Sequence, residues 1–89
     1  MLSPSYTNQF EKDLSLAKKR NKNIEKLKIL LTKLINEEEL PKKYKDHPLV
    51  GNYAYRRECH IEPDWLLIYK KMDYEIIFER TGTHSDLFK

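Results

Sequence analysis

The sequence at residues 65–69 is Trp-Leu-Leu-Ile-Tyr, and this run decides how the surrounding chain is organised. Apolar side chains stand at both odd and even positions, which predicts a strand that is buried on both faces and lies centrally in a sheet. The flanking residues indicate an antiparallel meander. Its predicted parts are a strand over 53–61, a turn at Pro63-Asp64, a hairpin connection over 70–73, a strand over 74–81 and a break at Gly82.

Upstream of about residue 40 the apolar residues recur with helical spacing. One stripe at i, i+4 and i+7 is formed by Phe10, Leu14 and Ala17. It predicts a first helix that is capped by Thr7 or Asn8 and ends near residue 20. A second helix is predicted from about residue 23 to residue 36, where apolar residues share one face: Ile24, Leu27, Leu30, Leu31, Leu34 and Ile35. The short break between the two predicts a helical hairpin.

Helices followed by strands predict an α+β fold. We expect a single domain over residues 1–89, with the helical hairpin packed on one face of a small antiparallel sheet. Residues 2–6 are predicted to form a short leading strand at the sheet edge, where Pro4 is tolerated, and residues 41–51 a loop. The other sheet face is expected to be open, or partly covered by the tail from residue 83. Function is expected on that face.

The composition indicates a small globular domain. Of 89 residues, 39% are hydrophobic and 35% are charged, so we expect a modest core and a shallow surface site. No apolar run approaches the roughly 18 residues that span a membrane, and the first residues lack the pattern of a secretory signal. Together with a single cysteine, these features predict a cytoplasmic protein.

Two features have both a structural and a functional interpretation. Cys59 is either a catalytic thiol or a buried strand residue, and the strand pattern favours burial. Residues 12–28 hold seven basic side chains and two acidic ones, in a chain whose formal net charge is +3. This block either attracts a phosphate chain or forms a solvated helix face.

All three histidines lie in the C-terminal half, at His47, His60 and His84. Histidine gives and takes protons near neutral pH, so three of them near Asp64 and Arg80 indicate acid–base chemistry. A zinc site is the rival hypothesis. None of the spacings matches a compact zinc motif, so we expect no metal and no other cofactor.

Strand alternation sorts the polar residues by face. One face of the strand at 53–61 carries Arg56, Glu58 and His60. Arg80 has the same parity as Ile76 and Phe78, two large apolar residues. Either the tail covers those two, or a β-bulge re-aims the arginine.

Three segments carry a resemblance to a known family: Lys-Asp-His-Pro-Leu (45–49), Arg-Glu-Cys-His-Ile-Glu-Pro-Asp-Trp-Leu-Leu-Ile-Tyr (57–69) and Phe-Glu-Arg-Thr-Gly-Thr-His-Ser-Asp-Leu-Phe (78–88). In order and spacing they resemble the YafQ branch of the RelE/ParE toxin superfamily, over essentially the whole chain. The resemblance implies a RelE-like microbial RNase fold and the toxin of a type II toxin–antitoxin system. It implies a ribosome-dependent endoribonuclease that cuts mRNA in the decoding site of the 70S ribosome. The implied partner is a DinJ-like cognate antitoxin, with operator DNA reached only through the antitoxin complex.

Carried over by motif, the resemblance implies a set of site residues. The implied catalytic residues are His84, His60, Asp64, Arg80 and His47. The implied substrate-binding residues are Phe88, Trp65, Arg56 and Lys45. Trp65 and Phe88 would stack on bases, although core packing is the alternative for Trp65.

RNA supplies its own nucleophile, the 2′-hydroxyl, so the enzyme needs a base, an acid and a partner for the phosphate. We expect His84 to be the acid and either His60 or Asp64 to be the base. Arg80 is expected to pair its planar fork with two phosphate oxygens, with His47 assisting.

A second hypothesis stays open, because superfamily members differ in chemistry. It is a non-cleaving toxin or binding module on the same scaffold, such as a ParE-like gyrase inhibitor or an antitoxin-dependent co-repressor. The histidines discriminate between the two, since a non-cleaving module has no use for them.

Overall fold

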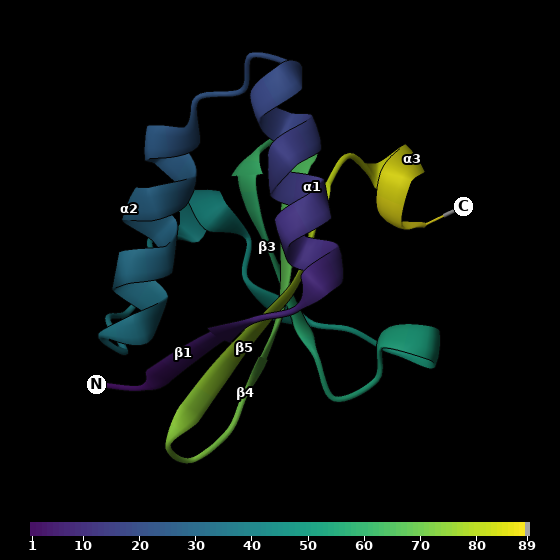
Figure 1. Cartoon of the computed structure of the whole chain (residues 1–89). Coiled ribbons are helices and arrows are strands. Elements are labelled where there is room, and N and C mark those ends of the chain that lie inside the picture. Colours follow the sequence, from purple (N-terminus) through teal and green to yellow (C-terminus); the bar gives the residue numbers. More distant parts are fainter. Residues whose placement is uncertain (89) are drawn as a thin grey trace.

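The computed structural model describes residues 1–88 and is shown in Figure 1. Its elements are β1 (Ser3–Tyr6), α1 (Asn8–Lys19), α2 (Ile24–Ile35), the 3-10 helix η1 (Lys42–Tyr44), β2 (His47–Pro48), the 3-10 helix η2 (Gly51–Tyr53), β3 (Arg57–Glu62), β4 (Trp65–Lys71), β5 (Glu75–Gly82) and α3 (His84–Leu87). Within the described residues, the helices are too short and too polar to traverse a lipid bilayer.

The strands form one sheet in the order β1-β5-β4-β3-β2, so β4 is central as its two-sided apolar pattern predicts. The neighbours of β4 run antiparallel to it, as does β2 to β3. The leading strand, for which the sequence indicated no direction, pairs with β5 in parallel, so the sheet is mixed at this edge. This direction lets β1 lead straight into α1, which packs back across β5.

The helical hairpin forms where the sequence predicts it, and polar side chains cap both helices. Thr7, not Asn8, caps α1, and its hydroxyl accepts a hydrogen bond from the Phe10 amide at 3.0 Å. Asn23 caps α2 in the same way. Between the helices the chain reverses at Asn21, whose φ of 59° lies in the left-handed region that asparagine tolerates.

The main core lies between the helices and one face of the sheet. Its fully buried members include Phe10 from α1, Leu27 from α2, and Trp65 and Phe78 from the sheet. A smaller cluster occupies the opposite face, where Leu66 and Ile68 pack beneath Leu87 of α3. The tail therefore partly covers the second face, and it does so as a short helix that the sequence does not predict.

A β-bulge in β5 resolves the ambiguity at Arg80. Ile68 of β4 pairs with Arg80, but the next residue, Tyr69, pairs with Phe78, so Glu79 is the extra residue. Phe78 thus faces the main core, whereas Arg80 turns to the face that carries Ile68. The bulge, and not a covering tail, places the arginine.

The segment before β3 differs from the prediction. Residues 53–56 are not a strand: Tyr53 ends η2, and Tyr55 adopts a φ of 69°. The strand begins at Arg57, and the preceding loop instead contributes β2, a two-residue strand whose His47 pairs with Glu58. Local apolar patterns do not predict such a short strand, because its partner is what defines it.

The burial of Trp65 allows its contribution to the stability of the main core to be tested. It is 1% exposed and faces the helices, so Trp65→Ala is expected to lower the free energy of unfolding by about 3–5 kcal/mol. Urea denaturation followed by circular dichroism measures this change. The control is Tyr74→Ala, at a side chain that is 84% exposed, where the expected change is within about 0.5 kcal/mol. Equal small changes in both variants would contradict the assigned core.

Candidate active site

The three histidines come together in one row on the face opposite the main core. His47 comes from β2, His60 from β3 and His84 from the start of α3. The ring centroids of His47 and His60 are 6.4 Å apart, and those of His60 and His84 are 5.8 Å apart. Segments separated by some 40 residues thus place three proton-carrying side chains side by side.

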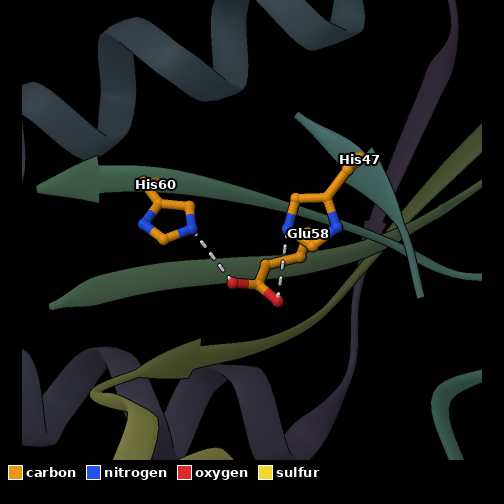
Figure 2. A group of neighbouring side chains, drawn as sticks. All are labelled: His47, Glu58 and His60. Carbon is orange, nitrogen blue, oxygen red and sulfur yellow. Dashed lines mark ion pairs between the residues drawn. The ribbon is translucent and has the colours of Figure 1, made fainter. Parts of the chain in front are cut away.

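A buried carboxylate, Glu58, lies between two of these histidines (Figure 2). Its Oε1 is 3.2 Å from Nε2 of His60, and its Oε2 is 3.8 Å from Nε2 of His47. Glu58 is 5% exposed, whereas the side chain of His47 is 47% exposed and that of His60 is 16% exposed. The sequence did not single out Glu58 as a site residue, although its strand parity with His60 was the available signal.

Proton positions in this group follow from the acceptors around it. Nδ1 of His47 is 3.1 Å from the carbonyl oxygen of Pro48, which can only accept, so Nδ1 carries the proton. Nε2 of His47 forms an ion pair with Glu58 only when the ring carries a second proton.

His84 has a carboxylate of its own, Asp64, in the turn between β3 and β4. One oxygen of Asp64 accepts from the His84 backbone N–H at 2.9 Å and lies 2.6 Å from Nδ1 of the ring. The backbone bond, followed by the ring, lowers the pKa of Asp64. The ionised carboxylate can only accept, so Nδ1 of His84 carries a proton and Nε2 is left to exchange one.

Arg80 shares this face, but its guanidinium is already engaged. Its Nε and Nη2 donate to the two oxygens of Asp13 in α1, at 2.7 and 3.2 Å. This hydrogen bonding raises the pKa of Arg80. The expectation that the planar fork is open to two phosphate oxygens is therefore wrong for this conformation. Asp13 also accepts from the Thr81 amide at 3.1 Å, so α1 holds the end of β5 in place.

A contact from Arg20, the residue that follows α1, fixes the helix that carries His84. Arg20 donates to Asp86 at 2.7 Å, and Asp86 also accepts from the Thr83 amide at 2.9 Å in a capping box. These bonds, the one from Arg20 foremost, lower the pKa of Asp86. A β-carbon at Gly82 would lie 2.9 Å from an Asp86 oxygen, so only glycine allows this approach.

The other histidine-bearing segments are held in a comparable way. Asp46, next to His47, accepts from the Tyr69 hydroxyl at 2.7 Å and from Arg57 at 3.2 Å. Glu62, near the turn that carries Asp64, pairs with two lysines of the helical hairpin region at 3.1 and 3.4 Å. Ion pairs thus tie both loops to the rigid sheet and helices.

The two aromatic candidates have different environments. Phe88 is 42% exposed, packs edge-on against Tyr53 with centroids 5.6 Å apart, and lies 6.4 Å from the His84 ring. It is available to a base. The expectation that Trp65 stacks on a base is wrong, because Trp65 is buried on the helical side of the sheet. The sequence did not indicate Tyr53 as a neighbour of Phe88 at the site, because the segment of Tyr53 was predicted to be a strand.

The remaining candidates are less directly placed. Arg56 is half-buried and donates to Glu79 at 2.8 Å, so its charge is already paired. Lys45 is exposed, with a φ of 48°, two residues before His47. Cys59 is fully buried, and burial raises the pKa of its thiol, so it is a core residue and not a nucleophile.

The row also contains a set of atoms that could hold a metal ion. Ligand atoms of His47, Glu58 and His60 lie within 4.8 Å of one another (Figure 2). Two imidazoles and a carboxylate suit a borderline ion such as Zn²⁺, whose bonds of about 2 Å would require the three side chains to draw closer together. The metal hypothesis therefore gains support from the structure that the sequence spacings did not give.

Comparisons with known proteins agree with one another. Residues 2–89 match the model of a family described as "Bacterial toxin of type II toxin-antitoxin system, YafQ". The chain is 55% identical over 84 residues to the "mRNA interferase toxin YafQ" of Escherichia coli strain K12, covering 93% of this chain and 91% of that protein.

Solved structures show the same fold. The toxin in a crystal structure of the E. coli DinJ-YafQ complex superposes with a TM-score of 0.94, at 51% identity, with all of both chains covered. A metal-bound toxin from Helicobacter pylori superposes with a TM-score of 0.92, at 38% identity, over 99% of this chain and 100% of that one.

The Arg20–Asp86 contact predicts a specific dependence of stability on pH. Because the pKa of Asp86 is lowered in the folded state, its carboxylate stabilises the fold above the ordinary aspartate pKa of about 3.9. That stabilisation is lost as the pH falls through the folded pKa. Asp86→Asn is therefore expected to be less stable than the wild type at pH 7, with the difference closing towards pH 3 and below.

Urea denaturation at pH 7, 5 and 3 measures the difference. Asp73→Asn, at an exposed aspartate in the turn between β4 and β5, is the control and is expected to change stability little at any of these values. If the loss in Asp86→Asn stays constant as the pH falls, the proposed anchoring by the ionised carboxylate is wrong.

Proposed function

The chain belongs to the YafQ family of bacterial toxins from type II toxin–antitoxin systems, and on this premise we propose that it is an endoribonuclease that cuts mRNA on the ribosome. The observation that carries the proposal is the row of three imidazoles with Glu58 and Asp64 behind it. The row lies on an accessible face next to an exposed phenylalanine. The E. coli relative with 55% identity bears the name mRNA interferase.

In the proposed reaction the 2′-hydroxyl attacks the adjacent phosphorus, and the bond from phosphorus to the 5′-oxygen breaks. His84 is the acid: its Nε2 gives a proton to the leaving 5′-oxygen, while Asp64 holds the ring through Nδ1. Asp64 accepts two bonds from His84, which favours an orienting role over that of the base. The products are a 2′,3′-cyclic phosphate and a free 5′-hydroxyl.

His60 is the proposed base, supported by Glu58. With its Nε2 directed at the carboxylate, His60 has Nδ1 left to accept the proton of the 2′-hydroxyl. His47 bears its second proton and stabilises the charge that develops on the phosphate. Arg80 contributes through Nη1, since Asp13 occupies its other donors. Phe88 positions a base by stacking.

The proposed partner is a cognate antitoxin, since the E. coli relative crystallised in complex with DinJ. Operator DNA would be reached through that complex alone. Action on translated mRNA places the toxin in the bacterial cytoplasm. A non-cleaving module on the same scaffold is disfavoured, because it would have no use for three histidines paired with carboxylates.

The acid role is tested by His84→Ala. Loss of the acid is expected to lower kcat for mRNA cleavage by about 10²–10⁴-fold, because the 5′-oxygen would leave unprotonated. Asp64→Asn is expected to lower kcat as well, since an amide can turn the ring to the wrong tautomer. Cleavage is measured by mapping mRNA 5′ ends in a reconstituted translation reaction.

Ser85→Ala is the matched control, at an exposed neighbour in the same helical turn, and is expected to keep wild-type kcat. Circular dichroism checks that all three variants fold. Wild-type cleavage by His84→Ala would sink the acid assignment, and wild-type protein that leaves translated mRNA intact would sink the proposed function itself.

The group of His47, Glu58 and His60 predicts inhibition by metal. An ion bound there would hold Nε2 of His60 and take Glu58 from it, so the ring would lose the carboxylate that supports it as a base; Zn²⁺ is therefore expected to inhibit cleavage and EDTA to leave it intact. Calorimetric titration is expected to show Zn²⁺ binding that His60→Ala weakens by about tenfold or more. Activity that disappears with EDTA and returns with Zn²⁺ would instead make the ion part of the catalytic machinery.

A further inference from the structure

A groove leads away from the histidine row between α2, η1 and the end of β3. Its volume is about 650 Å³. Three residues of α2 line one wall at i, i+3 and i+7, which places them on one helix face: Lys26, Ile29 and Lys33. Lys43, Tyr44 and Lys45 also line the groove, and so does His60 of the histidine row.

The groove carries an excess of positive charge. Four lysines line it, against one carboxylate, Glu62. Lys26 pairs with that carboxylate at 3.1 Å, and Lys33 lies 3.6 Å from Glu38 outside the groove. Among the ion pairs of residues 1–88, neither Lys43 nor Lys45 takes part. The exposed ion pairs of Lys26 and Lys33 are weak, so these lysines can exchange their carboxylates for a stronger anion.

The surface between the lysines is apolar and aromatic. Ile29 is 48% exposed because it lies off the buried face of α2, so it adds little to the core. Tyr44 is half-buried and carries the ammonium of Lys43 over its ring at 5.2 Å. A basic rim around an aromatic surface is the arrangement with which proteins bind single-stranded nucleic acid, through phosphates and stacked bases.

We propose that this groove is a subsite for the RNA strand on one side of the cut, an inference that rests on the proposed function. The ring of His60 belongs both to the groove and to the catalytic row, so a strand whose scissile phosphate lies at the row continues into the groove. Lys33 and Lys43 bind its phosphates, and a base that takes the place of the Lys43 ammonium stacks on Tyr44, whose ring also packs against the main core. An acidic segment of the antitoxin is the competing occupant, but the position of His60 in both the groove and the catalytic row favours the RNA strand.

Charge reversal at the two non-catalytic lysines tests the subsite. Lys33→Glu with Lys43→Glu is expected to raise KM for mRNA in the reconstituted reaction by about tenfold, with kcat unchanged. The control is Lys12→Glu with Lys18→Glu, an equal change in net charge on exposed positions of α1, with no change in KM. If the charge-reversed pair does not fold, alanine at the same two positions is expected to give a smaller rise.

A crosslink identifies the occupant. The native Cys59 is buried, so Ile29→Cys places one accessible thiol in the groove for a photoactivatable label. Combined with His84→Ala to prevent cleavage, it is expected to crosslink to mRNA on translating ribosomes. Tyr74→Cys, in the turn between β4 and β5, is the control and is expected to give no mRNA crosslink.

The outcomes separate the subsite from the proposed function. Wild-type protein that cuts mRNA, together with reversed variants of unchanged KM, would overturn the subsite and leave the function standing. Crosslinks confined to ribosomal RNA, or a loss of antitoxin affinity without a change in KM, would also overturn it. A failure of the wild type to cut mRNA would instead overturn the function on which the subsite rests.

Discussion

The burial of β4 on both of its faces is the constraint on which the rest of the structure depends. One set of its side chains, including Trp65, needs the helical hairpin as cover, and the other set, Leu66 and Ile68, needs something on the opposite face. Leu87 supplies that cover. Because Leu87 lies in the same short helix as His84, covering the second face also brings the proposed acid back over the sheet, beside His60. The same short helix therefore completes both the small apolar cluster and the histidine row.

Irregular backbone then assigns side chains to the correct faces. A regular β5 would place Arg80 in the main core with Phe78, and the bulge at Glu79 turns it to the face of the histidines. A second register shift lies between His60 and Glu62, where β3 turns towards Asp64. The first irregularity adds Arg80 to the histidine face, whereas the second pairs Glu62 with Trp65 and so turns that carboxylate towards the lysines of the helical side.

Carboxylates organise the site throughout. Glu58 and Asp64 orient imidazoles. Asp13 holds the end of β5 through Arg80, and Asp86 ties α3 to Arg20 at the end of α1. An 89-residue chain has little interior with which to fix loops. Charge-assisted hydrogen bonds replace part of that missing packing and leave the imidazole edges facing solvent. The lysine-rich groove beyond His60 lies towards α2 and carries the opposite charge, which suits a polyanion that contacts both.

Periodicity in the sequence determined the helical hairpin, the central strand and the α+β class, because each of these depends on apolar residues that recur over local distances. The motifs determined the family and indicated the three histidines and Asp64 as site residues. Only the tertiary structure decided the rest: the parallel β1, the two-residue β2, the helix at His84, the pairing of Arg80 with Asp13, the burial of Trp65 and the part of Glu58. Each of these is set by a partner far away in the chain, and local sequence carries no record of which partner that is.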